Sequence, residues 1–252
     1  MKILVTNDDG IQSKALKTLV KYLSKNNDVY VVAPDSQRSG FSHSMTFRRP
    51  MFMKEVDVEG AVKAISLTGS PADCVRFALR CLKMDIDMVI SGPNIGPNLT
   101  VDVYYSGTVG AASEGAILGK PAIAVSCVCR HIDENLLNFN PTCEFISKNL
   151  DKFYASHKDG VIFNVNVPDV EESKIKGIKI VKYGQKMFED EFVPHYDQQN
   201  NIIGYSLEGD FMAFEKPEET DAYYAGQNYI TITPLHFDLC DYQLIENLKE
   251  VF

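Results

Sequence analysis

A buried strand that runs into two adjacent carboxylates constrains this chain most strongly. The apolar run Ile3–Val5 shows no alternation, which is typical of a central parallel strand, and Asp8 and Asp9 follow it closely. Neighbouring carboxylates repel each other, and a cation or a proton relieves that repulsion. Open α/β sheets also place their ligands at the carboxyl ends of their strands. The sequence therefore predicts a divalent metal held by Asp8 and Asp9.

The chain that follows alternates between helical and strand patterns. Apolar residues recur at helical spacing after Ser13, which we interpret as a helix N-cap, and Asp28–Ala33 is a second short apolar strand. This alternation predicts right-handed βαβ units and a parallel sheet. Further patterns indicate strands at 87–91, 121–128, 161–167 and 227–234, and helices at 71–82 (capped by Ser70), 106–118, 133–151 (with Pro141 at a break or a second start) and 241–252.

The character of the sequence changes after about residue 184. Periodicity fades, and turn-forming residues such as Pro194 and Gly204 favour a hairpin or an extended arm. Aromatic residues continue through it, which suggests packing on another subunit: Phe188, Phe192, Tyr196, Tyr205, Phe211 and Phe214. We expect one domain overall, in which 1–184 form the catalytic core and 185–252 form an arm, a closing strand and a helix exchanged between subunits.

Two polar loops follow other predicted strands on the same edge as the Asp pair. The segment 35–44 contains Ser39 and reads either as a solvated loop or as part of a site. The segment 92–98 contains two Gly and two Pro, so we expect neither helix nor strand pairing there, and Asn94 and Asn98 offer oxygen ligands or amide donors. Carboxylate, hydroxyl and amide oxygens suit Mg²⁺ or Mn²⁺ rather than zinc.

A helix with a small-residue first turn is predicted to begin after Ser106. Backbone N–H groups and the helix dipole at such a start favour a phosphate, although a Gly-rich and Ala-rich start can also serve tight packing alone. A hard metal beside this helix suggests metal-assisted attack of water on a phosphate ester, with Ser106, Thr108 and nearby amides holding the phosphoryl oxygens.

Composition excludes several other classes. The 252 residues carry a formal net charge of -9, which argues against binding of polymeric nucleic acid. The six cysteines lack CxxC pairing and read mostly as buried free thiols. We find no signal peptide and no apolar run near the roughly 20 residues that span a bilayer, so we expect no membrane partner and a cytoplasmic location.

Six motifs in order along nearly the whole chain give a specific resemblance. They are Thr6-Asn7-Asp8-Asp9-Gly10, Ala33-Pro34-Asp35 with Arg38-Ser39-Gly40, Ser91-Gly92-x-Asn94-x-Gly96-x-Asn98, Tyr105-Ser106-Gly107-Thr108-Val109 with Ala111-Ala112-x-Glu114-Gly115, Asn164-x-Asn166-Val167-Pro168, and Thr233-Pro234-Leu235. The chain resembles the SurE survival-protein nucleotidases. Pro93 stands where Ile is common in the family, which should stiffen the Asn94 loop and leave the ligand in place.

The resemblance implies a fold, an activity and a set of site residues. The fold is a Rossmann-like three-layer α/β/α sandwich with a mostly parallel sheet and an extended C-terminal hairpin. The activity is a metal-dependent phosphatase acting on nucleoside 5′- and 3′-monophosphates, with short polyphosphate as a further substrate of some relatives. Homodimers or tetramers exchanging C-terminal segments are implied, with one Mg²⁺ or Mn²⁺ per subunit. The implied metal ligands are Asp8, Asp9, Ser39 and Asn94, with Asp8 or Asp9 as a possible base, and the implied phosphate contacts are Asn98, Ser106, Gly107 and Thr108.

Other interpretations remain open at this point. Asp8-Asp9-Gly10 can be only a turn and helix-entry signal. A Rossmann-type oxidoreductase would need a Gly-x-Gly-x-x-Gly turn where Asn7–Gly10 stands. A non-catalytic nucleotide sensor would bind nucleotide without releasing phosphate. We expect His43 not to touch the substrate and His236 to be structural.

Overall fold

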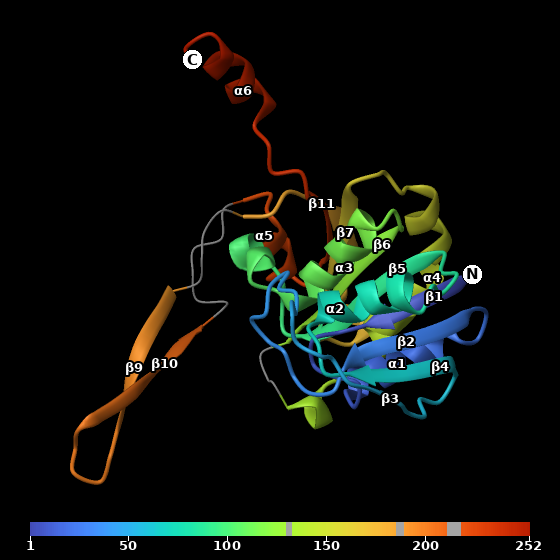
Figure 1. Ribbon diagram of the computed structural model, residues 1–252, viewed down its shortest axis with the longest axis horizontal. Helices are drawn as coiled ribbons and strands as arrows, with labels where there is room; N and C mark the ends of the chain where they lie inside the picture. The colour runs from blue at the N-terminus through green and yellow to red at the C-terminus, as the bar shows by residue number, and fades with distance from the viewer. Residues whose placement is uncertain (130–132, 185–188, 211–217) are drawn as a thin grey trace.

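The computed structural model describes residues 1–129, 133–184, 189–210 and 218–252, and its centre is one nine-stranded sheet (Figure 1). The sheet order is β3-β4-β2-β1-β5-β6-β7-β11-β8, and β9 and β10 pair separately. The strands are β1 (Lys2–Thr6), β2 (Asp28–Pro34), β3 (Met53–Glu55), β4 (Ala61–Leu67), β5 (Met88–Ile95), β6 (Ala122–Val128), β7 (Val161–Pro168), β8 (Ile178–Ile180), β9 (Glu189–Tyr196), β10 (Ile202–Asp210) and β11 (Ile230–His236).

Six α-helices and four short helical turns surround these strands in the described residues. The helices are α1 (Lys14–Leu23), α2 (Pro71–Arg76), α3 (Gly107–Ile117), α4 (Asn140–Ala155), α5 (Asp221–Ala225) and α6 (Tyr242–Lys249). The turns are the π-helical η1 (Phe77–Cys81) and the 3₁₀ turns η2 (Thr100–Tyr104), η3 (Glu134–Leu136) and η4 (Glu172–Lys174). No helix within the described part of the chain is long and apolar enough to cross a membrane.

The sheet is mostly parallel, as predicted. From β4 to β7 every neighbouring pair runs parallel, whereas β3 pairs antiparallel with β4 and β11 antiparallel with β7. Because the parallel strands share one direction, the loops after β1, β2 and β5 all leave from the same edge of the sheet. This edge is where the predicted site residues lie.

Helices cover both faces of the sheet and close two apolar cores. The core on one face joins α1 and α4 to the sheet, through residues such as Leu19 and Ile146. The other core joins α2 and α3, through residues such as Val75 and Ala112. The layers are therefore helix, sheet and helix (Figure 1), and the predicted α/β fold class is confirmed.

Small residues let α3 lie almost on the sheet. A Cβ added to Gly115 would stand 3.0 Å from Val89 Cβ, so a larger residue would push the helix and the strand apart by a few tenths of an ångström. Most of α3 is buried, and its start at Ser106 faces the edge that carries the polar loops. Packing on the sheet thus fixes where the first turn of α3 points.

Three local expectations need correction or refinement. Ser13 precedes α1, but its hydroxyl makes no capping bond and instead donates to Glu134 Oε2 at 3.4 Å. The expectation that 92–98 makes no strand pairing is wrong for its first half, because β5 runs to Ile95 and resumes pairing with β6 after a bulge between Ser91 and Asn94. The helix expected at 133–151 is two elements, η3 and α4, and Pro141 lies in the first turn of α4.

Two elements of the C-terminal quarter leave the compact body, while β11 of the same quarter lies in the sheet. Figure 1 shows the β9–β10 hairpin and α6 projecting away from the sheet in different directions. The predicted hairpin is present, with Pro194 opposite Tyr205. Of the aromatic residues expected to pack on another subunit, Phe192, Tyr196 and Tyr205 are exposed, while Phe188, Phe211 and Phe214 lie outside the described residues. Exchange of this region between subunits stays a prediction.

Candidate metal and phosphate site

Three loops and the start of α3 meet at the carboxyl edge of the sheet. The Arg38 N–H, after β2, donates to the Asp8 carbonyl oxygen at 2.6 Å. The Ile95 N–H, at the end of β5, donates to Asp9 Oδ2 at 3.3 Å. The Thr108 hydroxyl, on α3, donates to Asp8 Oδ1 at 2.5 Å. The Asp pair is thus the point where these segments converge.

The turn after β1 is braced by its own side chain. Asn7 Nδ2 donates to the Gly10 carbonyl oxygen at 3.1 Å, and Asn7 Oδ1 accepts from the Gly10 N–H at 3.2 Å. Gly10 has φ of +98°, which L side chains rarely adopt. This turn is therefore rigid, and it holds Asp8 and Asp9 side by side.

Asp8 lies directly against the first turn of α3. A Cβ at Gly107 would stand 3.0 Å from Asp8 Cβ and 3.2 Å from Pro71 Cγ, so the contact leaves no room for a side chain. Asp8 itself is only 3% exposed. The carboxylate is consequently buried at a helix N-terminus, beside the backbone amides of Gly107 and Thr108.

The two carboxylates are poorly neutralised by the protein. Burial, and then the charge of Asp8, raise the pKa of Asp9 to about 8. Burial also raises the pKa of Asp8, against the Thr108 hydrogen bond, which lowers it. No Lys or Arg forms an ion pair with either carboxylate among the described residues. Negative charge therefore accumulates here without a protein cation.

Asn94 and Ser39 lie in the neighbouring loops, and they differ in their hydrogen bonds and in their exposure. Asn94 Nδ2 donates to the Gly96 carbonyl oxygen at 2.9 Å, which leaves Oδ1 free to turn toward a cation. Ser39 is exposed and its Oγ accepts from Gln37 Nε2 at 3.0 Å. Within the described segments, Ser39 makes no hydrogen bond to Asp8 or Asp9, although the adjacent Arg38 does contact the turn. Asn94 therefore has a free oxygen that a metal could bind, whereas the Ser39 hydroxyl already accepts a hydrogen bond from Gln37.

Asn98 is held inside the protein by residues whose role the sequence did not reveal. Its N–H donates to Asn166 Oδ1 at 2.9 Å, and its carbonyl oxygen accepts from Asn164 Nδ2 at 2.8 Å and Asn166 Nδ2 at 3.0 Å. Its own Nδ2 donates to Ser126 Oγ at 2.8 Å. In the sequence, the sign of this role was the presence of two asparagines, Asn164 and Asn166, at alternate positions of the buried strand β7. Asn98 therefore positions the loop, and one of its amide protons is already used.

Ser106 caps α3, as the sequence predicted. Its Oγ accepts the Val109 N–H at 3.1 Å. The first N–H groups of an α-helix lack intrahelical acceptors, and the Thr108 N–H here lies against the Asp8 carboxylate, where its hydrogen bond lowers the pKa of Asp8. A helix start of this kind, beside the buried Asp8 and the half-buried Asp9, is suited to an anion.

A buried ion-pair cluster further along α3 was missed by the sequence analysis. Glu114 is 2% exposed; His43 Nε2 lies 2.9 Å from its Oε2 and Arg76 Nε lies 2.6 Å from its Oε1. Burial pushes the pKa of Glu114 up, but the hydrogen bonds from His43 and Arg76 outweigh it and hold the pKa below its ordinary value. A Cβ at Gly110 would meet the Ser42 carbonyl oxygen at 2.5 Å. The loop after β2 is thus clamped onto α3.

The two histidines behave as expected in part. His43 contacts Glu114 rather than the Asp pair. His236 Nδ1 accepts the Asp238 N–H at 2.9 Å at the end of β11, which is a local structural contact. Whether either touches substrate stays a prediction.

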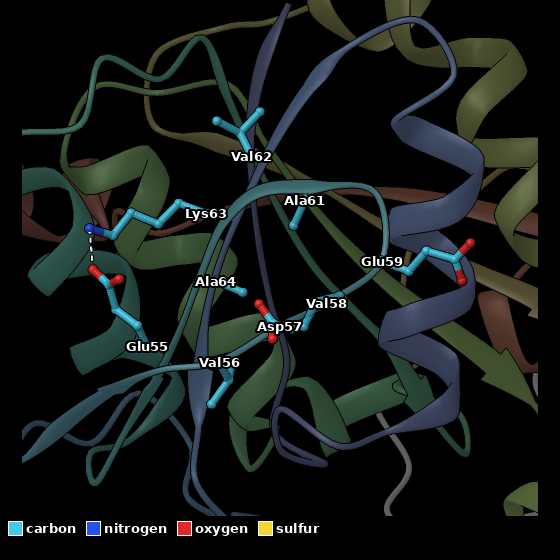
Figure 2. A pocket seen from close by; sticks show the side chains of 9 residues that line it. All are labelled: Glu55, Val56, Asp57, Val58, Glu59, Ala61, Val62, Lys63 and Ala64. Atoms are coloured by element: carbon cyan, nitrogen blue, oxygen red, sulfur yellow. Dashed lines mark ion pairs between the residues drawn. The ribbon is translucent and has the colours of Figure 1, made fainter.

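A well-defined surface hollow lies away from this site. A cavity of about 480 Å³ lies where β3 and β4 meet, lined by residues 55–59 and 61–64 (Figure 2). It lies at the amino end of β4, the opposite edge from Asp8 and Asp9. Its one ion pair joins Lys63 to Glu55 at 2.5 Å and turns away from the apolar side chains of the loop. Convergent polar groups, and not volume, mark the candidate site.

The residues present fit a hard divalent cation. Two carboxylates without a protein cation, an amide oxygen with its nitrogen turned away, and a nearby hydroxyl are oxygen donors of the kind that Mg²⁺ and Mn²⁺ prefer. The described residues contain no cluster of three or more His, Cys, Asp or Glu that could hold a metal. A metal here would therefore complete its coordination with Asn94, Ser39 and water.

Comparisons with known proteins agree on one family. The profile of the family described as Survival protein SurE matches residues 3–190. A protein from Clostridium botulinum (strain ATCC 19397 / Type A) named 5′-nucleotidase SurE is 42% identical over 254 residues, covering 100% of this chain and 99% of that protein. A protein of the same name from Clostridium beijerinckii is 40% identical, again over 100% of this chain. The crystal structure of the SurE protein from Aquifex aeolicus superposes with a TM-score of 0.85 at 32% identity, covering 100% of this chain and 99% of that one.

Proposed function

The chain belongs to the SurE family, and from that premise we propose that it is a phosphomonoester hydrolase that uses a divalent metal to release phosphate from nucleoside 5′-monophosphates. The observation that carries this proposal is the Asp8–Asp9 pair, which forms no ion pair with a Lys or Arg among the described residues and, through the buried Asp8, abuts the start of α3. Its relatives named 5′-nucleotidase SurE support the substrate class.

In this proposal one set of side chains binds the metal, and the backbone amides at the start of α3 bind the phosphate. Asp8 and Asp9, with Asn94 and Ser39, would hold Mg²⁺ or Mn²⁺, one per subunit. Such an ion supplies Lewis-acid polarisation of the phosphoryl group and makes a water nucleophile accessible at neutral pH. The N–H groups of Gly107 and Thr108 would donate hydrogen bonds to the phosphoryl oxygens as negative charge develops on those oxygens.

The remaining site residues keep this geometry in place. The Thr108 hydroxyl fixes the orientation of Asp8, and the Ser106 cap fixes the first turn of α3. Asn98 holds its loop through Asn166 and Ser126. In this proposal Asp8 or Asp9 is also the candidate general base.

Several finer properties belong to the same proposal. The substrates include nucleoside 3′-monophosphates, with short polyphosphate as a side substrate. The protein works in the cytoplasm as a homodimer or tetramer that exchanges its C-terminal segments. Exposed apolar side chains on the projecting hairpin and on α6, such as Ile203 and Leu248, support an assembly that covers them.

The test is phosphate release from a panel of 5′- and 3′-nucleotides by protein stripped with EDTA and then supplied with Mg²⁺, Mn²⁺ or Co²⁺. We expect no release without metal and recovery with at least one ion. Asp8→Asn should remove most of the activity while the protein stays folded, and Asp151→Asn on the exposed face of α4 is the matched control. Wild-type turnover by Asp8→Asn in excess metal would overturn the assignment. Bound NAD or flavin, or nucleotide binding without release, would point to the oxidoreductase or sensor interpretations.

A further inference from the structure

Three exposed aromatic rings lie beside the candidate phosphate site. Phe41 is 43% exposed, Tyr104 52% and Tyr105 53%. Phe41 stands two residues after Ser39, and Tyr105 directly precedes Ser106. Single exposed aromatic residues are ordinary on protein surfaces. Three that flank predicted metal and phosphate ligands on two different chain segments call for a common explanation.

The two segments are joined to each other by hydrogen bonds. The Ser42 N–H donates to the Tyr105 carbonyl oxygen at 3.0 Å, and the Ser42 hydroxyl donates to the Tyr104 carbonyl oxygen at 2.6 Å. The same Ser42 backbone packs against Gly110 of α3. The backbone under all three rings is therefore one fixed junction at the start of α3.

Two of the rings are also oriented by neighbouring side chains and stay partly exposed. The Arg38 guanidinium lies over one face of the Phe41 ring, 5.6 Å from its centroid, which leaves the other face to a ligand. The Tyr104 ring packs edge-on against Tyr183, with centroids 6.4 Å apart and planes at 83°, and the two hydroxyl oxygens are 3.3 Å apart. Rings that are oriented but exposed are prepared to stack on a flat ligand at little cost in side-chain entropy.

We propose that Phe41, Tyr104 and Tyr105 form a platform on which the nucleobase of the substrate stacks. This inference rests on the proposed function, because a nucleoside monophosphate held by its phosphate at Gly107 and Thr108 places its base one ribose away. Every base has a π-face, so such a platform accepts all bases. The platform separates nucleotides from simple sugar phosphates, which carry no ring to stack.

The test compares AMP with ribose 5-phosphate, which keeps the phosphate and sugar but lacks the base. In Tyr104→Ala and Phe41→Ala, kcat/KM for AMP should fall on the order of tenfold more than kcat/KM for ribose 5-phosphate. The loss should lie mainly in KM, since the base is remote from the reacting phosphorus. Tyr104→Phe, which keeps the ring, should restore the wild-type preference.

Tyr154→Ala removes an equally exposed ring from α4, on the other face of the sheet, and serves as the matched control. Equal losses on both substrates, or an unchanged preference for AMP, would overturn the platform. A change in oligomeric state with equal losses on both would show instead that a second copy of the chain covers the rings.

A binding measurement separates this inference from the proposed function. Calorimetric titration of AMP and of ribose 5-phosphate into the wild type and Tyr104→Ala does not depend on turnover. If the wild type hydrolyses neither compound with any metal, the proposed function fails. A binding preference for AMP that is lost in Tyr104→Ala would still support the platform, and a preference that survives would reject it.

Discussion

Two buried carboxylate clusters lie against the same helix and are neutralised in opposite ways. At the first turn of α3, Asp8 and Asp9 have no protein cation, and the pKa of each is raised. One to two turns further along, Glu114 is paired with Arg76 and His43, and its pKa is lowered. The chain supplies its own positive charge where a carboxylate holds the structure together, and leaves charge unbalanced where a ligand is expected.

A third cluster shows that like charge alone is not a mark of a metal site. Asp102 and Asp221 are neighbours, and burial, then the charge of Asp221, raise the pKa of Asp102 to about 6. Asp221, however, accepts N–H bonds from Thr100, Gly184 and Ala222 at 2.8–2.9 Å. The Asp221 oxygens are occupied by the backbone, whereas Asp102 Oδ1 is buried without a hydrogen-bond partner. What distinguishes the Asp8–Asp9 pair is its place at the edge of the sheet, where the end of β5 and the start of α3 both contact it.

The largest expected effect separates the two clusters by activity. Asp9→Asn should lower phosphate release by at least about 100-fold, because loss of even an outer-shell partner of a metal commonly costs 10–100-fold. Glu114→Gln should lose less than about 10-fold, since it acts only through the loop that it clamps. Initial rates with AMP at saturating Mn²⁺ measure both. A larger loss of activity in Glu114→Gln than in Asp9→Asn would show that the Glu114 cluster, and not the Asp pair, matters more for catalysis.

Stabilisation by metal should follow the same division. Mg²⁺ or Mn²⁺ at 100 times its Kd should stabilise the wild type by about 2.7 kcal/mol. The shift in Tm should vanish in Asp8→Asn and persist in Glu114→Gln, because only the first variant removes an expected ligand. Differential scanning fluorimetry with and without EDTA gives the comparison. An undiminished shift in Asp8→Asn would place the metal elsewhere.

Stability without metal should show the opposite order. Glu114→Gln removes the charge that Arg76 and His43 share, so we expect the free energy of unfolding to fall by about 1–3 kcal/mol. Asp8→Asn relieves repulsion and should leave the stability unchanged or higher in EDTA. Urea denaturation of both variants decides between them. A fall in Asp8→Asn equal to that in Glu114→Gln would mean that the Asp pair also serves the fold.

The smallest effects are pH dependences of opposite sign. Because the folded pKa of Glu114 lies below its ordinary value of 4.5, its stabilisation is present above pH 4.5 and is lost as the pH falls further. Because the folded pKa of Asp102 is about 6 against an ordinary 3.8, its contribution is present below pH 4 and is lost as the pH rises through 6.

Thermal unfolding in EDTA from pH 3 to pH 8 tests both signs. Glu114→Gln should flatten the acid side of the profile, and Asp102→Asn should flatten the fall between pH 4 and pH 6. If Asp102→Asn leaves that fall unchanged, another group is responsible for it.

The sequence by itself determined the fold class and indicated the place of the candidate site. Strand and helix patterns are local, so apolar runs such as Ile3–Val5 and the Ser106 cap could be recognised without neighbours. Parallel strands then bring the residues after β1, β2 and β5 to one edge. The order of these polar loops along the chain was enough to indicate a metal beside a helix start, and enough to reveal the family.

Only the tertiary structure decided which polar groups are free to bind. The Thr108 hydroxyl is used by Asp8, 100 residues away in sequence, and the amide of Asn98 is used by Ser126. The ion pairs of Glu114 join α3 to α2 and to the loop after β2, and no local pattern encodes them. Hydrogen bonds and ion pairs act over a few ångströms in space. Whether a polar side chain is still free to bind a ligand therefore depends on neighbours that the fold brings close, and not on the order of the sequence.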